Sequence, residues 1–293
     1  MSNPSADRIS DFRTTQLMIA GDFEAYHYRA PYFQSLDFHT HDFYELYLFL
    51  DGRVTYYIED FAFNLMSGDL LAIAPGRMHR PVIEDEQAVY ERMVLWLNAG
   101  YLRALADGAD TLTDALDRIS LQNGGRIRLA EEDLAFTRQL LAHLVASRDG
   151  DEARKLHQDA LVTALLTQDC LLATGEQAMT GSPAAESAGD ALIADVIRYI
   201  DAHLSEPLSL DDICAAFYIS KFHLLRRFKT YTNATLYDYI LSKRIGLARR
   251  LIREGATASA ASEACGFCDY SSFYKCFTAK TGLTPSQFKT ERR

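Results

Sequence analysis

Short apolar segments separated by turn residues dominate the chain from about residue 12 to residue 98. Segments such as LYLFL, FAFNLM and LLAIA have the length of strands, and SGD and PG interrupt them. Asp51 and Gly52, between YELYLFL and RVTYYIE, form a two-residue hairpin signal. Many short strands with turn residues between them predict an antiparallel barrel or sandwich.

The apolar spacing changes to a helical period between about residues 100 and 173. Phe136, Leu140 and Leu144 recur every four residues, and Leu161 and Leu165 mark the apolar side of a second helix. Two amphipathic helices after a barrel could cap it or could form a dimer contact. The sequence leaves both alternatives open.

Residues 174–190, TGEQAMTGSPAAESAGD, contain neither Lys nor Arg and are rich in Gly and small residues. This composition is typical of a flexible linker. We therefore divide the chain into a barrel with its helices at 1–173, a linker at 174–190 and a helical module at 191–293. A length of 293 residues suits two domains.

Charge is distributed unevenly between the two parts. Residues 191–293 hold 15 Lys and Arg against 10 Asp and Glu, a net charge of +5. The preceding residues carry a net charge of −15, and the two parts add up to the overall −10. A basic module attached to an acidic one is consistent with nucleic-acid binding by the former. The N-terminus lacks the layout of a signal peptide and no apolar run has the length of a membrane span, so we expect a cytoplasmic protein without membrane contacts.

The five cysteines do not indicate a disulfide framework, because their number is odd and the chain shows no secretory signal. CGFC at 265–268 resembles half of a zinc or redox motif. A structural zinc site needs four ligands, and only Cys276 lies nearby. We interpret these residues as ordinary helical thiols.

The C-terminal module begins with a pattern typical of a helix-turn-helix. In LSLDDICAAF, Ser209 and Asp212 have the spacing of a capping box. The following SKFHLLRRFKTYT predicts a second, basic helix, for which Ser220 is the N-cap. Two short helices joined by a tight turn, with the second basic, predict DNA binding.

The same pattern recurs 49 residues later. RRFKTYTNATLYDY aligns with KCFTAKTGLTPSQF, so that Phe228 matches Phe277 and Thr232 matches Thr281. Asn233 and Gly282 also align, and these are the residue types that most readily end a helix in the left-handed conformation. LYDYILSKRIGLARRLIREG reads as the helix that connects two helix-turn-helix units.

Residues 191–293 closely resemble the DNA-binding domain of the AraC/XylS family, through LSLDDICAAFYISKFHLLRRFK, YILSKRIGLARRLI and GFCDYSSFYKCFTAKTGLTPSQFK. The resemblance implies recognition helices at about 221–231 and 270–280, which read double-stranded DNA. The side chains that we expect at the DNA are Lys221, Phe222, Leu225, Arg226, Lys229, Tyr270, Ser271, Tyr274 and Lys275.

Residues 39–79 resemble the cupin-type sensor barrel that precedes this domain in many AraC members. In cupins that use a metal, the positions matching His39, His41, Glu45 and His79 bind the ion. His39, His41 and Glu45 share one strand face by alternation. We expect an effector pocket lined by His39, His41, Glu45, Tyr56, Arg77 and His79. A divalent metal at the four cupin positions stays open, as do histidines with a purely structural role.

The expected fold class is α+β: an antiparallel cupin-like β-barrel with helices at its C-terminal end, then an all-α double helix-turn-helix domain. The expected function is sequence-specific transcription regulation, controlled by a small effector such as a sugar or a related metabolite. Expected partners are DNA, the effector, a second copy of the chain and, for an activator, RNA polymerase. We expect no catalytic residues and no obligatory cofactor. The alternative is a cupin metalloenzyme, of the sugar isomerase or dioxygenase type, with an appended DNA-binding domain.

Overall fold

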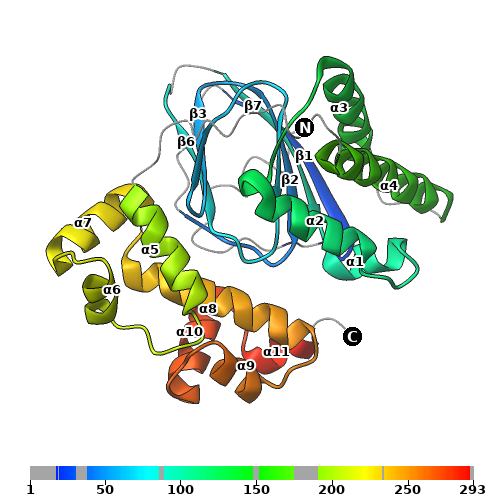
Figure 1. Cartoon of the computed structure of the whole chain (residues 1–293). Helices are drawn as coiled ribbons and strands as arrows, with labels where there is room; N and C mark the ends of the chain where they lie inside the picture. The colour runs from blue at the N-terminus through cyan, green and yellow to red at the C-terminus, as the bar shows by residue number, and fades with distance from the viewer. Residues whose placement is uncertain are drawn as a thin grey trace.

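The computed structural model describes residues 18, 20–30, 38–85, 89–147, 152–174, 191–232 and 234–290. A β-rich N-terminal part, here called the β-domain (20–174), precedes an all-helical C-terminal part (Figure 1). The α+β class expected from the sequence is confirmed. The proposed linker lies, beyond residue 174, outside the described residues, so the domain boundaries stay a prediction.

The strands of the described residues form two antiparallel sheets instead of one closed barrel. The first sheet has the order β1-β7-β2-β5-β8, and the second has the order β4-β3-β6. An isolated antiparallel bridge pairs His39 with His79 of β6. The strands are β1 (Phe23–Ala30), β2 (Tyr44–Asp51), β3 (Val54–Ile58), β4 (Phe61–Asn64), β5 (Asp69–Ile73), β6 (His79–Ile83), β7 (Tyr90–Leu97) and β8 (Arg126–Arg128).

The prediction of a hairpin at Asp51 and Gly52 is wrong. β2 pairs with β5 and β7, whereas β3 pairs with β4 and β6, so this turn carries the chain from one sheet to the other. Gly52 takes a φ of 128°, which side chains rarely adopt. The tight hairpin lies instead between β3 and β4, where Ile58 faces Phe61 across the ladder.

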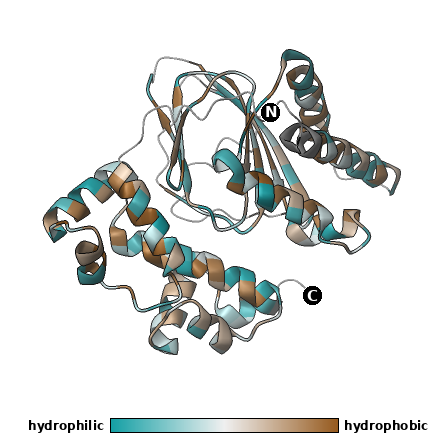
Figure 2. Ribbon diagram, viewed as in Figure 1, coloured by the Kyte–Doolittle hydropathy of each residue, from teal (hydrophilic) through white to brown (hydrophobic). Residues whose placement is uncertain are grey.

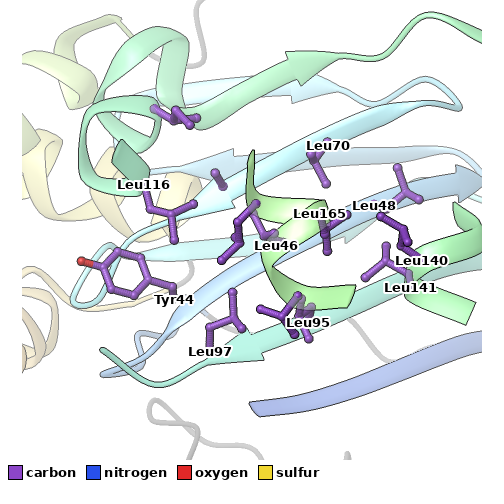
Figure 3. Packing of buried hydrophobic residues seen from close by; sticks show 14 of the residues in the cluster. Tyr44, Leu46, Leu48, Leu70, Leu95, Leu97, Leu116, Leu140, Leu141 and Leu165 are labelled. Atoms are coloured by element: carbon purple, nitrogen blue, oxygen red, sulfur yellow. The ribbon is translucent and has the colours of Figure 1, made fainter. Parts of the chain in front are cut away.

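Helices α3 and α4 cap the five-stranded sheet, which is one of the two roles that the sequence leaves open. Their bounds and those of the preceding helices are α1 (Ala99–Leu105), α2 (Thr111–Leu121), the 3₁₀ turn η2 (Gln122–Gly125), α3 (Glu131–Ala146) and α4 (Glu152–Thr174). Leu140 and Leu165 are buried against Leu46 and Leu95 of the sheet (Figure 3). Phe136, expected on the apolar face of α3, is 44% exposed.

The C-terminal part contains two helix-turn-helix units joined by one long helix. Its helices are α5 (Ala191–Ala202), α6 (Leu210–Ala216), α7 (Lys221–Thr232), α8 (Leu236–Arg253), α9 (Ala258–Ala264), α10 (Tyr270–Thr281) and α11 (Pro285–Thr290). α8 is the connecting helix. Across the described part of the chain, no helix combines the length and apolar character that a membrane crossing requires.

The internal duplication is visible in matching hydrogen bonds. The Thr232 hydroxyl donates to the Phe228 carbonyl and accepts from the amide of Ala234. The Thr281 hydroxyl donates to the Phe277 carbonyl and accepts from the amide two residues on in the same way. Gly282 ends α10 with a φ of 74°. The 49-residue repeat therefore corresponds to two copies of one local structure.

Two apolar clusters hold the helical part together, and the first of them includes residues of the β-domain. Ile197 and Phe228 pack in one cluster with Phe38 and Met78, which are at most 1% exposed. A second cluster surrounds Phe277 and the end of α8. Figure 2 shows hydrophobic and hydrophilic residues alternating along α5 and α8, as expected for helices with one buried face. The first helix-turn-helix unit thus shares its core with the β-domain.

Candidate functional site

The structure brings together His39, His41, Glu45 and His79 of the expected pocket. Glu45 stands in β2 and His79 begins β6, so the cluster lies where the two sheets approach one another. His39 and His41 precede β2 on the segment that bridges to β6 instead of lying in a strand. All four side chains are buried, with exposed fractions of at most 5%.

Backbone carbonyls orient two of the imidazole rings. Nδ1 of His41 lies 2.7 Å from the Phe43 carbonyl oxygen, and Nδ1 of His79 lies 2.9 Å from the Arg77 carbonyl oxygen. Because a carbonyl only accepts, each Nδ1 carries the proton. The Nε2 atoms of His41 and His79 then face the Glu45 carboxylate, at 2.8 and 3.6 Å.

The hydrogen-bond acceptors of this cluster outnumber its donors. Burial lowers the pKa of His41, although its hydrogen bond to Glu45 acts in the opposite direction. Burial alone would raise the pKa of Glu45, but its interactions with His41 and His79 bring it well below its usual range. A neutral His41 ring carries one proton, so it can donate to either the Phe43 carbonyl or the Glu45 carboxylate but not to both. A proton, a cation or a donor group of a ligand would complete the cluster.

These residues fit a divalent cation. One ligand atom each from His41, Glu45 and His79 lies within 4.8 Å of the others, and all three residues are buried. Imidazole and carboxylate ligands suit Zn²⁺, Mn²⁺, Fe²⁺ or Ni²⁺. The hydrogen bonds to backbone carbonyls resemble the outer contacts that orient histidine ligands in metal sites. His39 lies beside this group, with its ring centre 4.3 Å from that of His79.

Tyr56 and Arg77, the other expected pocket residues, have different positions. The Tyr56 ring is buried and nearly parallel to that of His79, with 6.2 Å between centroids. The Arg77 guanidinium is instead held by Glu59, at 3.1 Å, and by Ser120 of α2. The structure therefore does not bring the guanidinium of Arg77 to the cluster, and only its carbonyl contacts His79.

Sequence reasoning missed Tyr90, whose hydroxyl lies against that of Tyr47 in the apolar core between the sheets. Burial raises the pKa of both tyrosines above the ordinary value. The phenols therefore stay protonated and can donate hydrogen bonds. No signal in the sequence ties Tyr90 to the histidines.

The first expected recognition helix, α7, presents its predicted DNA-contacting residues to solvent. Phe222 is 77% exposed and Leu225 is 41% exposed, whereas the intervening Leu224 is fully buried. Arg226 and Lys229 are exposed on the same helix. Lys221 is also exposed and forms an ion pair with Asp211 of α6 at 2.6 Å. Exposure of Phe222 excludes the alternative that it belongs to the core.

The second expected recognition helix, α10, has a corresponding face. Tyr270 and Tyr274 are 43% and 40% exposed, and Ser271 and Lys275 are exposed beside them. Asp269 caps this helix by accepting a hydrogen bond from the amide of Ser272 at 2.8 Å. α7 and α10 thus offer polar and aromatic side chains to a partner in matching positions of the repeat.

Comparison with known families agrees with both halves of this description. A model described as "AraC-like ligand binding domain" matches residues 20–168, and one described as "Helix-turn-helix domain" matches residues 213–291. The chain belongs to the AraC family. Like other AraC-family proteins of this organisation, it is a DNA-binding transcription regulator with a ligand-binding domain.

Relatives of similar length include two HTH-type transcriptional activators. The HTH-type transcriptional activator RhaR of Shigella dysenteriae serotype 1 is 24% identical over 257 residues, which are 86% of each chain. RhaR of Escherichia coli O139:H28 is 24% identical over 256 residues, again 86% of each chain.

Solved structures with some likeness include ToxT from Vibrio cholerae, at 13% identity and a TM-score of 0.36, covering 92% of this chain and 98% of that one. The DNA-binding domain of AdpA in complex with a target DNA has 23% identity and a TM-score of 0.33, covering 34% of this chain and 91% of that one.

Proposed function

We propose that the effector of this AraC-family regulator binds at the cluster of His39, His41, Glu45 and His79. The observation that carries this proposal is an under-satisfied buried polar group: Nε2 of His79 makes no hydrogen bond to the described residues and only faces the Glu45 carboxylate at 3.6 Å. Leaving such a group unsatisfied costs about 1–3 kcal/mol. A ligand that supplies the missing hydrogen bond therefore gains binding free energy, because it removes a cost that the surrounding core leaves in place.

The chemistry of the surroundings suits a polyhydroxylated effector such as a sugar or a sugar acid. Imidazole, carboxylate and phenol groups from His79, Glu45 and Tyr56 offer both donors and acceptors within one apolar enclosure. Aromatic faces beside these groups match the apolar faces of a sugar ring. The relatives are named as HTH-type transcriptional activators, which is consistent with a regulator of transcription.

DNA binding is assigned to the exposed faces of α7 and α10. Arg226 and Lys275 supply charge for phosphates or base edges, and Leu225 supplies an apolar surface for a thymine methyl group. We further infer a homodimer formed through α3 and α4, where Phe136 and Leu156 are 44% and 71% exposed. Action on DNA implies a cytoplasmic location and, for an activator, contact with RNA polymerase.

A metal-dependent cupin enzyme is the second candidate, and the ligand geometry of His41, Glu45 and His79 favours it. We propose the non-catalytic regulator instead, because the attached DNA-binding part already gives a binding event a use. Metal analysis of the purified chain, with turnover assays against hexoses, pentoses and sugar acids, separates the two. Turnover would establish the enzyme, whereas saturable binding without turnover supports the regulator.

The pocket itself is tested by a double variant, His41→Ala with Glu45→Ala. We expect it to bind DNA selected by the wild-type chain from a random duplex pool, because the recognition helices lie outside the β-domain. In cells carrying a reporter with that DNA, it should lose the response that wild type shows to one compound of a carbohydrate panel. A normal response by the double variant would place the effector elsewhere in the chain.

A further inference from the structure

The segments that carry the histidine cluster also form the contact with the helical part. Three pocket residues are each followed by a residue that points the opposite way: His41 by Asp42, His79 by Arg80, and Tyr56 by Tyr57. The first member of each pair lies in the cluster or the core, and the second meets the helix-turn-helix region. Alternation along extended backbone places them on opposite sides.

Asp42 forms ion pairs with the C-terminal half of the connecting helix α8. Its carboxylate pairs with Arg249 at 2.5 Å and also with Arg253, and Arg253 donates to its backbone carbonyl. Asp42 and Arg249 are 8% and 1% exposed. Both guanidinium groups also lie over the ring of Phe288 in α11, at 5.5 and 5.0 Å from its centre. Asp42 therefore holds α8 together with the second helix-turn-helix unit.

Glu59 contacts the middle of the same face of α8. It forms ion pairs with Lys243 of α8 and with Arg77, which lies two residues before His79. Glu59 has a φ of 53°, an uncommon conformation for a residue other than glycine. Backbone strain at such a position persists where surrounding contacts enforce it. Between the two carboxylates, Gly246 brings the helix close to the β-domain: a Cβ there would lie 3.5 Å from the Cα of Gly76.

The first helix-turn-helix unit is held at a third point. Arg80 donates to the Tyr231 carbonyl at 2.7 Å, and its guanidinium lies over the rings of Phe38 and Tyr57. Phe38 in turn packs against Tyr239, at 6.4 Å between centroids. Contacts from the pocket segments thus reach both helix-turn-helix units and the helix between them.

We propose that the ion pairs of Asp42 and Glu59 with α8, here called the clamp, transmit pocket occupancy to the DNA-binding units. A ligand that displaces His41 moves the adjacent Asp42, which pairs with Arg249 of α8. A ligand that displaces His79 moves the nearby Arg77, which pairs with Glu59, the partner of Lys243 in α8. The inference rests on the proposed effector pocket for its biological meaning. The mechanical link between the cluster and α8 is independent of which ligand binds.

Hydrogen–deuterium exchange of the full-length chain tests the clamp. Glu45→Gln changes the pocket and keeps its shape, and Asp42→Asn removes the clamp charge. We expect each to speed exchange in peptides covering α8 by about fivefold or more, the lower range of typical coupling between sites. The two substitutions combined should do no more than Asp42→Asn alone. Gly246→Leu, which wedges the interface open, should give the same result by a different route.

Arg250→Ala is the matched control, because Arg250 is an exposed arginine of α8 that pairs with Glu254 of the same region. It should leave α8 exchange unchanged, and peptides of β7 report whether each variant is folded. If Asp42→Asn and Gly246→Leu leave α8 as protected as in wild type, the clamp is wrong. If both loosen α8 and Glu45→Gln does not, the clamp is not coupled to the pocket. Neither result depends on the effector-response experiment, so the two proposals can fail separately.

Discussion

Leu225 is an apolar side chain that stands in solvent beside a buried leucine, and this contrast makes its role testable. It is 41% exposed, whereas Leu224 is fully buried. A large apolar residue on the outer face of a recognition helix has a natural partner in a base methyl group.

We expect Leu225→Glu to abolish DNA binding, because the new carboxylate would face phosphates, and to change the free energy of unfolding by no more than about 0.5 kcal/mol. Leu224→Ala, one residue away, should instead cost about 2–5 kcal/mol of stability. Fluorescence anisotropy with labelled DNA and chemical denaturation measure the two effects. A large stability loss in Leu225→Glu would assign this side chain to the core.

The positions of site residues that follow from local sequence patterns were predicted well. The positions of residues whose partners are distant in the chain were not. The expected strand alternation and the cupin pattern placed His41, Glu45 and His79 together, and the structure brings them within contact distance, although His41 lies before β2 and not in a strand. Asp42 gave no signal, because its partner Arg249 lies more than two hundred residues away in the chain. The expectation that the Arg77 side chain lies at the pocket was wrong, because the sequence does not show that Glu59 is its partner.

At the scale of elements, the helical half was predicted closely and the sheets less so. Capping residues such as Ser209 and the repeat of Thr232 at Thr281 fix helix ends by local hydrogen bonds, which the sequence displays. Strand pairing is decided by contacts between distant segments. The turn at Gly52 therefore looked like a hairpin, and the short strand β8, which joins β5, was not expected at all.

The junction of α5, α8 and the β3–β4 turn gives a pH-dependent prediction. Asp201 of α5 lies 3.0 Å from Lys243, which also pairs with Glu59, and Arg77 is close by. Burial raises the pKa of Asp201 from 3.8 to about 6, although Lys243 opposes the shift. Between pH 3.8 and about 6, Asp201 holds a proton in the folded chain and has released it in the unfolded chain. The stability that this proton contributes is complete below pH 4 and is lost as the pH rises through 6.

Asp201→Asn should therefore gain stability relative to wild type as the pH rises from 4 to 7, by at most about 3 kcal/mol and less where solvent screens the pair. Urea denaturation of both chains at several pH values measures the difference, in which the titration of all other groups cancels. A difference that stays constant with pH would show that Asp201 titrates normally in the folded chain.

At the scale of the whole molecule, Phe38 decides whether the two parts unfold together. Its ring is fully buried in a cluster made mainly of helical-domain residues, with Tyr239 on one side and Tyr57 on the other. Truncation of a buried phenylalanine costs about 3–5 kcal/mol. We expect wild type to show one calorimetric transition and Phe38→Ala to show two, because the shared core is lost. Two separate transitions in wild type would mean that this contact contributes little to cohesion.

If the clamp transmits pocket occupancy, it also limits which sensor domains can be fused to this DNA-binding part. Tyr239 and Phe288 occupy equivalent positions of the repeat, and the β-domain meets the first through Phe38 and the second through the arginines that hold Asp42. A gene fusion that joined this DNA-binding part to a foreign sensor would keep both recognition helices and lose these partners. On the proposed mechanism, the hybrid would bind the same DNA and would not respond to its new ligand. A responsive hybrid would therefore need the α8 residues that face the sensor, Lys243, Arg249 and Arg253, to be matched to the new sensor.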